Sequence, residues 1–237
     1  MKYFYNLKKI KSDEFILYHH LGLGDHIICA GLVNYLSSSY KKIYLPVKKN
    51  NFNNIDYLFR NNKNIELFTI IENEGSEVDK FAEEKNLSVL KIGFEKMKNP
   101  FDINFYIQIR LPYTISYDYF SLNNTEKDEA ELKNYVLNFY NINNSKYALI
   151  HNETSFEKYE LNIINENKAY VSKESDKFEN IFLYKKLIED AAEIHCVNSS
   201  FLHLVERINT KAKLFYHEKR VGPLSLTKEW NIIKYEN

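Results

Sequence analysis

Short apolar runs of strand length alternate with amphipathic segments of helix length along most of this 237-residue chain. In the first half the expected strands cover residues 15–20, 43–47, 65–71 and 87–92, and the expected helices cover 27–36, 52–60 and 78–86. Strands separated by short helices favour right-handed crossovers and a mostly parallel sheet that is covered on both faces. The pattern therefore predicts an α/β fold.

The second half repeats this alternation after an irregular middle region. Expected strands cover 147–150, 169–171, 193–197 and 212–216, the last of which closes the predicted sheet, and expected helices cover 181–190 and 200–208. A capped helix start is predicted at Thr125, and 141–145 is typical of a linker. We therefore expect two Rossmann-like domains, 1–140 and a shorter 146–237, with mostly parallel sheets facing a cleft.

Charge and composition exclude several classes of protein. Lys plus Arg and Asp plus Glu are equal at 32 each, so the chain lacks the basic excess of a protein that coats nucleic acid. Cys29 and Cys196 each lie in an apolar run, which predicts buried thiols rather than a redox pair. The most apolar stretch, 15–33, contains His19, His20, Asp25 and His26, whose polar groups are costly in lipid. We therefore expect no membrane span and a cytoplasmic protein.

The turn Gly22-Leu23-Gly24-Asp25 follows the first long strand and opens a helix. Glycines at the carboxyl end of such a strand let a ligand approach the backbone, and the first turn of the helix offers unpaired N–H groups. Asp25 is either a helix cap or a catalytic carboxylate, and the histidines beside the turn, His19, His20 and His26, are alternative proton acceptors. The turn lacks the third glycine of the dinucleotide-binding fingerprint, which disfavours an NAD-dependent oxidoreductase.

A second turn, Asn198-Ser199-Ser200, joins a predicted strand to a predicted helix. Small hydroxyls at this place hold a diphosphate together with backbone amides, or else cap the helix. His203 is expected to face the same ligand from the first helical turn, and His195 inside the strand is expected to be a core residue. His151-Asn152 ends the first strand of this half.

Together the two turns resemble glycosyltransferases of the heptosyltransferase type, which have the two-domain GT-B fold. The Gly-Leu-Gly-Asp turn looks like the start of the first domain in that family. The run 197–204 is similar to the family's Asp-(Ser/Thr)-Gly-x-x-His-Leu donor-site motif. The resemblance implies that Asp25 is the general base on an acceptor hydroxyl and that Ser199, Ser200 and His203 contact the donor diphosphate.

The resemblance implies transfer from a nucleotide-sugar donor to a glycan or lipid-linked acceptor, as in polysaccharide biosynthesis. No Asp-x-Asp motif follows a predicted strand, so we expect the transfer to be metal-independent, and we expect no cofactor. Peripheral contact with a membrane stays open. His26 is kept as a second catalytic candidate beside Asp25. The remaining candidate ligand-binding residues are Gly22, Gly24, His20, His151, Asn198 and Arg220, the last as compensation for the charge of the leaving diphosphate.

The second half departs from the family pattern. Asn198 stands in place of the usual Asp and Ser200 in place of the usual Gly, and His151-Asn152 is not followed by a Gly-x-x-x-x-Lys loop. A non-catalytic protein that binds a nucleotide sugar or another small ligand on a degenerate GT-B fold is therefore the alternative. A metal site is disfavoured because the histidines lack His-Glu-x-x-His spacing and the cysteines lack Cys-x-x-Cys spacing.

Overall fold

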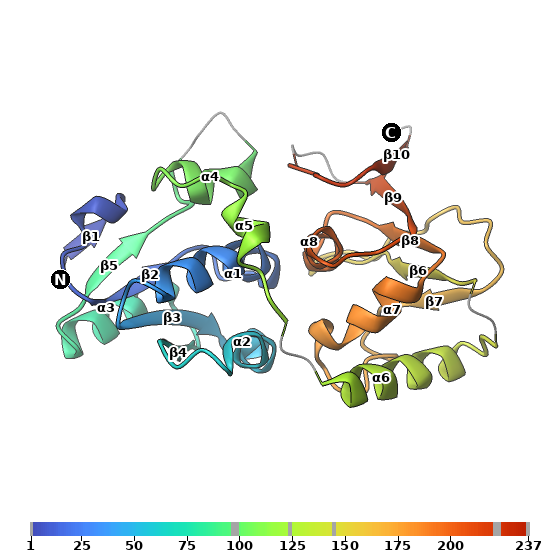
Figure 1. The fold of residues 1–237 in the computed structure, drawn as a ribbon, viewed down its shortest axis with the longest axis horizontal. Coiled ribbons are helices and arrows are strands. Elements are labelled where there is room, and N and C mark those ends of the chain that lie inside the picture. Colours follow the sequence, from blue (N-terminus) through green and yellow to red (C-terminus); the bar gives the residue numbers. More distant parts are fainter. Residues whose placement is uncertain (1, 96–99, 123–124, 144–145, 220–223, 236–237) are drawn as a thin grey trace. The chain divides into compact units, whose positions relative to one another are not determined.

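The computed structural model describes residues 2–95, 100–122, 125–143, 146–219 and 224–235, which form two compact units (Figure 1). Unit 1 comprises residues 1–121 and 223–225, and unit 2 comprises 122–222 and 226–237. This division falls before helix α6 (Glu126–Phe139), whereas the sequence indicated a boundary after it. Helix α6 belongs with unit 2 because it packs against the helices of that unit, where Lys133 pairs with Asp190 at 2.6 Å.

Unit 1 is built on a five-stranded sheet within the described residues, with strand order β1-β5-β2-β3-β4 and every pair parallel. The strands predicted from the first half are all present, and β1 adds an outer strand that was not predicted. The elements are β1 (Lys2–Phe4), η1 (Leu7–Lys9), β2 (Glu14–Tyr18), α1 (Leu23–Ser37), β3 (Lys42–Lys48), η2 (Lys49–Asn51), α2 (Phe52–Phe59), β4 (Ile65–Ile70), α3 (Glu74–Glu84), β5 (Ser88–Lys91), α4 (Phe101–Ile107) and α5 (Ile115–Asp118).

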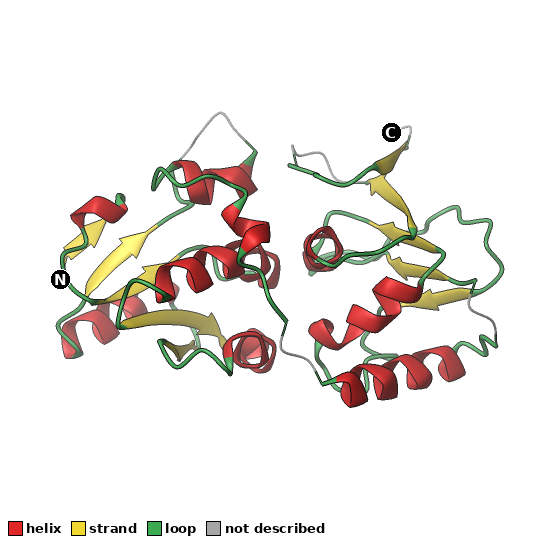
Figure 2. Cartoon of the chain, viewed as in Figure 1, coloured by secondary structure: helices red, strands yellow, loops and turns green. Residues whose placement is uncertain are grey.

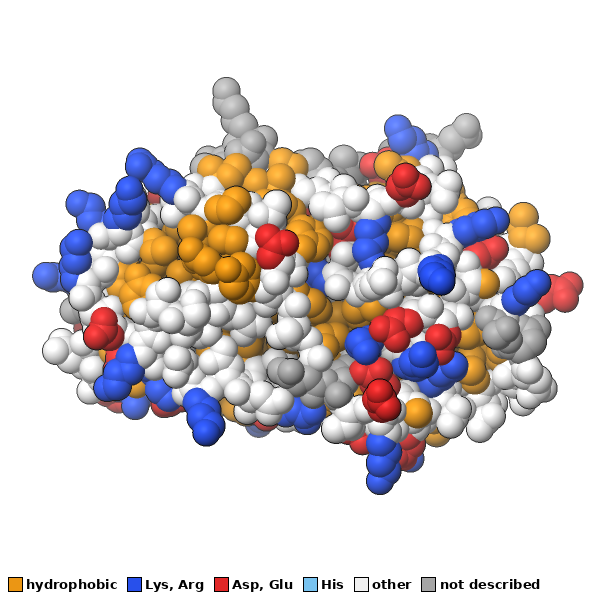
Figure 3. All heavy atoms as spheres, viewed as in Figure 1, with side chains coloured by type: hydrophobic (Ala, Val, Ile, Leu, Met, Phe, Trp, Pro, Cys, Tyr) orange, Lys and Arg blue, Asp and Glu red, His pale blue; other side chains and the backbone are white. Residues whose placement is uncertain are grey.

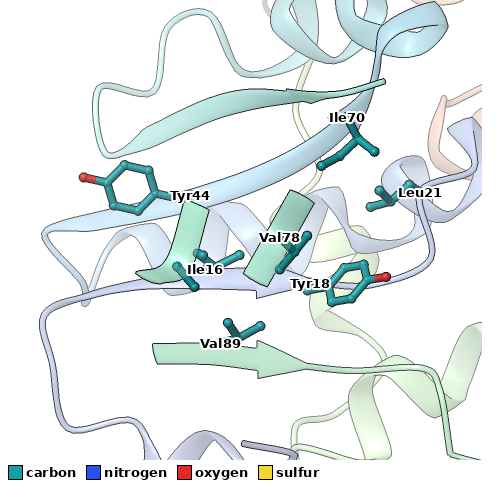
Figure 4. Packing of buried hydrophobic residues seen from close by; sticks show 8 residues of the cluster. Ile16, Tyr18, Leu21, Tyr44, Ile70, Val78 and Val89 are labelled. Carbon is teal, nitrogen blue, oxygen red and sulfur yellow. The ribbon is translucent and has the colours of Figure 1, made fainter. Parts of the chain in front are cut away.

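Both faces of this sheet are covered, which explains why β2 is apolar without alternation. Successive side chains of a strand point to opposite faces, so Ile16 and Tyr18 share one face while Phe15 and Leu17 share the other. Ile16 and Tyr18 pack in a buried cluster with Val78 of α3 (Figure 4). All four of these β2 side chains are buried.

Helix α1 packs unusually closely against α4 and α5. The backbone carbonyl of Ile28 accepts hydrogen bonds from Tyr106 Oη at 2.7 Å and from Ser116 Oγ at 3.0 Å. A Cβ atom built on Gly31 would lie 2.3 Å from the carbonyl oxygen of Ile115. Only a glycine at position 31 lets the backbones of α1 and α5 come this close.

Unit 2 contains a second all-parallel sheet of five strands within the described residues, in the order β10-β9-β8-β6-β7. Helices α6 and α7 pack against each other beside it (Figure 1). The predicted α6 N-cap is confirmed, because the Thr125 side chain accepts from Asp128 N. After α6 the elements are β6 (Ala148–His151), β7 (Lys168–Tyr170), η3 (Ile181–Tyr184), α7 (Lys185–Asp190), β8 (Glu193–Cys196), α8 (Ser200–Arg207), β9 (Lys213–Glu218) and β10 (Trp230–Lys234).

The prediction that residues 212–216 close this sheet is wrong. Strand β9 is flanked by β10, which pairs with it in parallel from Trp230 to Lys234. Strand β9 continues to Glu218, and His217 within it is fully buried, with its Nε2 atom 2.9 Å from His195 Nδ1. The prediction that His195 is a core residue is confirmed: it is buried and stacks on Phe215 at 4.5 Å.

Two buried carboxylates hold the segment that leads into β10, one in each unit. In unit 1, Asp102 accepts hydrogen bonds from the backbone N–H of Ser225 at 3.1 Å and from its hydroxyl at 3.0 Å. In unit 2, Glu206 accepts from the backbone N–H and the hydroxyl of Thr227, both at 2.8 Å. Asp102 also accepts from Tyr113 Oη and from the backbone N–H of Ile103, both at 3.1 Å, so its buried oxygens are paired within the protein.

Side chains on the surface differ between the two units. Hydrophobic side chains gather on one face of unit 1, whereas charged side chains of both signs are mixed over unit 2 (Figure 3). Among the described residues, no helix combines the length and the apolar composition that a membrane crossing requires. Cys29 and Cys196 are both buried free thiols, as predicted.

The close approach at Gly31 yields a test of the packing of unit 1. Gly31→Ala is expected to lower the free energy of unfolding by about 1–3 kcal/mol, since overpacking against a backbone carbonyl cannot relax by moving a side chain. The matched control is Gly75→Ala in the first turn of α3, where a Cβ meets no atom nearer than 3.8 Å. That control is expected to raise stability by about 0.5–1 kcal/mol, as is usual for Gly→Ala in a helix. Urea unfolding measures both, and equal effects of the two substitutions contradict the packing described here.

Candidate functional site

Each sheet has one place where the order of its strands reverses. In unit 1 the chain runs from β2 outward through β3 and β4, and then returns to the other side of β2 as β5. In unit 2 it runs from β6 to β7, and then returns beside β6 as β8. Ligands of open parallel sheets bind outside the carboxyl ends of the strands at such a switch point. The two edges therefore carry the candidate sites, at the ends of β2 and β5 and at the ends of β6 and β8.

Asp25 lies at the unit 1 switch point, on the first turn of α1. Gly22 is the N-cap residue of α1, and Gly24 and Asp25 are the second and third residues of the helix. The backbone N–H groups of Gly22 and Asp25 lie near the Asp25 carboxylate and favour its ionised form. The sequence left open whether Asp25 caps the helix, and the start of α1 has no side-chain capping hydrogen bond at its N-cap residue.

The Gly22 backbone is in an ordinary extended conformation, with φ −69° and ψ 150°. Glycine is therefore not required here for a left-handed turn. A Cβ at position 22 would, however, lie 2.6 Å from Asp25 Oδ2. Gly22 leaves the space that the Asp25 carboxylate occupies.

Burial raises the pKa of the Asp25 carboxyl to about 6 from the model-compound value of 3.8. Removal from water disfavours the ionised form, and this effect outweighs the neighbouring positive potential of His20 and Lys48 and the two backbone N–H donors, all of which favour it. The Lys48 ammonium is itself paired with Glu74 at 2.7 Å. A half-buried carboxyl group that titrates near neutrality is suited to accept and release a proton.

His20 connects the two strand ends of the unit 1 switch point. Its Nε2–H donates to the carbonyl oxygen of Gly93, which follows β5, at 2.9 Å. Gly93 has φ +84°, and a Cβ there would overlap the ring of Phe105. Its N–H donates to Gln108 Oε1 at 2.8 Å. The loop after β5 is thus fixed from both sides, and His20 is exposed at its edge.

His26 and His19 lie beneath this edge rather than on it. Both are buried, with ring centroids 4.6 Å apart in an edge-to-face arrangement. Burial lowers the pKa of His19 to about 4 and the pKa of His26 well below its usual value, so both rings are neutral at pH 7. Within the described residues neither ring nitrogen of His26 has a hydrogen-bond partner. Asp25, and not His26, is therefore the group that a ligand at this edge can reach.

In unit 2 the switch point is spanned by His151 and Ser199. His151 ends β6 and pairs in register with Cys196 of β8, and its Nδ1 lies 3.0 Å from Ser199 Oγ. The ring also stacks on Phe201 at 5.3 Å. Burial lowers the pKa of His151 to about 4, so the ring is neutral at pH 7.

The hydrogen bond to His151 leaves the start of α8 without a side-chain cap. Ser199 is the N-cap residue, but its hydroxyl makes no capping hydrogen bond, and Ser200 is the first helical residue. Asn198 and Ser200 are half-buried beside it. The first N–H groups of a helix carry partial positive charge and attract anions. The arrangement is thus compatible with a bound phosphate at this edge.

His203 is the fourth residue of α8, in the first turn of that helix. Its side chain is buried, and burial lowers its pKa to about 3, so it carries no charge at pH 7. Arg220, the candidate cation for a leaving diphosphate, lies outside the described residues. In the part of the chain that the structure covers, no three side chains of His, Cys, Asp or Glu converge as metal ligands do.

Sequence reasoning did not identify Gly93 or Lys48 as parts of the unit 1 edge. Gly93 directly follows a predicted strand, just as Gly22 follows the first long strand. A glycine directly after a strand is therefore the sequence signal that could have identified it. Lys48 ends β3, and only the neighbouring strand order brings it near Asp25.

The raised pKa of Asp25 predicts a stability effect with a definite sign. The folded state holds the proton more tightly than the unfolded state, so the free energy of unfolding falls as pH rises from about 4 to about 6. Above about pH 6 the loss of stability is complete. Asp25→Asn removes the ionisation and is expected to be about 1–3 kcal/mol more stable than wild type at pH 8, with the difference vanishing near pH 4. Urea melts at the two pH values measure this. Asp56→Asn, an exposed carboxylate of α2, is the control. Equal stability of Asp25→Asn and wild type at pH 8 contradicts the burial effect.

Comparisons with known proteins identify the fold of the chain but not a family to which it belongs. No family model matches the chain, and no curated protein matches it in sequence. Among solved structures it is similar to a glycosyl transferase of family 9 from Veillonella parvula, with a TM-score of 0.56 and 9% sequence identity. The similarity covers 94% of this chain and 87% of that one. The chain therefore has a GT-B-like glycosyltransferase fold, with two all-parallel sheets of the kind that the sequence indicated.

Proposed function

We propose that this protein is a glycosyltransferase that moves a sugar from a nucleotide-sugar donor to a hydroxyl group of a glycan or lipid-linked acceptor. The observation that carries the proposal is the Asp25 carboxyl group, with a pKa of about 6, at the switch point of a sheet in a glycosyltransferase-like fold. The heptosyltransferase type is the specific form of the proposal, and it rests on the two sequence motifs.

In the proposed reaction Asp25 is the general base. Its carboxylate accepts the proton of the acceptor hydroxyl while that oxygen forms a bond to the anomeric carbon of the donor sugar. The bond from the anomeric carbon to the diphosphate oxygen breaks, and its electron pair leaves with the nucleoside diphosphate. With a pKa of about 6, most Asp25 side chains are ionised at pH 7 and ready to accept the proton.

The edge of unit 2 is proposed to hold the diphosphate. The uncapped first turn of α8 supplies N–H donors, and Ser200 and Asn198 supply polar side chains next to it. Fixed N–H groups stabilise the charge that develops on the leaving diphosphate without reorganising during the reaction. In this proposal His151 orients the Ser199 hydroxyl through their hydrogen bond rather than touching the donor itself.

One observation favours a second candidate, a protein that binds a nucleotide sugar without transferring it. The connection after β6 contains no helix, so unit 2 offers one helix N-terminus, that of α8, beside its central strand. A donor held by fewer phosphate contacts is bound more weakly and oriented less well. Binding without turnover distinguishes this candidate from the enzyme.

The first test is binding and transfer with a panel of UDP, GDP, ADP and CMP sugars. A panel member that binds only the native state raises the melting temperature, and the donors that do so are then assayed with acceptor saccharides. Asp25→Asn is expected to lower kcat by about 10²–10⁴-fold while donor affinity stays the same. In wild type, kcat/KM is expected to fall as pH drops below about 6, because the base becomes protonated. Full activity of Asp25→Asn contradicts the assignment of the base, and stabilisation without transfer favours the binding protein.

Gly22→Ala tests the position of the carboxylate separately from its presence. The added methyl group displaces the end of a side chain rather than backbone, so the protein is expected to fold with a change of less than about 1 kcal/mol. Displacement of the base by about 1 Å is expected to lower kcat by about 10²-fold. Steady-state kinetics and urea unfolding measure the two effects, with Gly75→Ala as the control. An unchanged kcat contradicts the proposal that the position of the Asp25 carboxylate determines the rate of transfer.

A further inference from the structure

Four hydrogen-bonding side chains form a row across β8, β9 and the end of β10. His217 Nε2 lies 2.9 Å from His195 Nδ1, and His217 Nδ1 lies 2.6 Å from Tyr235 Oη. His195 Nε2 lies 3.5 Å from Glu193 Oε2. The register of the parallel strands and their two-residue period direct all four side chains to one face of the sheet. We call Glu193, His195, His217 and Tyr235 the histidine relay.

The carboxylate at one end sets the direction of the hydrogen bonds in the neutral relay. A carboxylate only accepts, so His195 carries its hydrogen on Nε2, facing Glu193, and accepts at Nδ1. His217 therefore donates from Nε2 to His195 and accepts at Nδ1. The hydrogen that it accepts there is that of the Tyr235 hydroxyl. Every hydrogen bond of the neutral relay thus points toward Glu193.

One added proton reverses the bond at the other end of the relay. The space between the two rings holds one hydrogen, whichever ring is the cation. A pair of rings with one extra proton must therefore carry a hydrogen on His217 Nδ1 as well. That hydrogen points at Tyr235 Oη, which now accepts instead of donating, and the phenol hydrogen loses its acceptor.

The two ends of the relay are also attachment points of the first crossover of unit 2. This crossover loop, residues 152–167, is described throughout and contains no helix (Figure 2). Asn165 Nδ2 donates to Glu193 Oε2 at 3.5 Å, the same oxygen that His195 Nε2 faces. The backbone N–H of Asn162 lies near Tyr235 Oη. Structureless connections of this length in a compact fold are uncommon and often functional.

The surroundings of the relay disfavour a positive charge at pH 7. Burial lowers the pKa of His217 to about 4, with smaller contributions from His195 and Lys219. Burial also lowers the pKa of His195, an effect to which Lys168 of β7 adds and which Glu193 opposes. Among the described residues, Glu193, Lys168 and Lys219 are the charged groups that act on the two rings. The relay is therefore neutral at pH 7 and takes up a proton in acid.

We propose that the histidine relay is a proton-operated latch on the crossover loop. In the neutral relay Glu193 and Tyr235 hold the loop through Asn165 and Asn162. Uptake of one proton strengthens the hydrogen bond of the ring to the Glu193 carboxylate, in competition with Asn165, and turns the Tyr235 hydroxyl at the other end. Both attachments weaken together. The latch operates independently of the proposed sugar transfer and controls the loop that leaves the candidate edge of unit 2.

The test is amide hydrogen exchange of the full chain by NMR at about pH 7 and about pH 4, corrected for the intrinsic pH dependence of exchange. The reporters are Asn162 N–H and Asn167 N–H, the latter bonded to Asn165 Oδ1 at 2.9 Å. Their protection is expected to fall at least about 10-fold in acid, whereas that of β6 and β8 is retained. His217→Gln keeps a neutral donor and acceptor but takes up no proton, so its loop is expected to stay protected at both pH values.

Ring ¹⁵N shifts of wild type follow the proton itself and need no variant. The two rings are expected to titrate as one coupled pair that takes up a single proton down to about pH 4. A proton taken up independently by each ring contradicts the shared position between them.

Three exchange results overturn the latch. Unchanged protection of the two reporters in wild-type acid shows that the relay does not hold the loop. Equal loss of protection in His217→Gln assigns the release to another group. Equal loss in β6 and β8 shows unfolding of the whole unit rather than release of a loop.

Discussion

Parallel pairing of every described strand is the constraint on which the rest of the structure depends. It turns all carboxyl ends of a sheet toward one edge, so the loops that follow β2 and β5 meet, as do those that follow β6 and β8. It also requires cover on both faces, which explains the unbroken apolar run of β2. Both features that we interpret as functional, the Asp25 carboxyl group and the uncapped start of α8, lie at such an edge.

Asp25 lies where one physical effect favours its charge and another disfavours it. The partial positive charge at the N-terminus of α1 attracts a carboxylate, yet burial disfavours the charge that Asp25 needs as a base. His26, one residue on, is buried with both ring nitrogens unpaired in the described structure, which also costs free energy. Local rules are broken most often at functional sites, and here two departures are adjacent.

Features set by local pattern were predictable from the sequence, and features set by strand order were not. The helices and strands of the first half, the Thr125 cap and the turn at Asp25 all follow from spacing over a few residues. The His20–Gly93 contact joins residues 73 apart and the His151–Ser199 contact joins residues 48 apart, so each depends on which strands are neighbours. Strand β10 was not predicted from the sequence, because it is an outer strand with several exposed side chains and weak apolar periodicity. Burial of His26 and His203 was missed because the fourth residue of a helix can face either the sheet or its edge.

The buried Asp102 carboxylate has a consequence for dividing the chain into modules. Neither unit is one contiguous piece of sequence, since residues 223–225 belong to unit 1 and are followed by the last strand of unit 2. A fragment that ends at residue 121 keeps Asp102 but loses both donors of Ser225, which leaves a buried charge with fewer partners. A recombinant protein that joins residues 1–121 to another second unit is therefore expected to have a less stable first unit, even though it keeps every strand of that sheet. The halves of this protein are expected to be inherited and exchanged together.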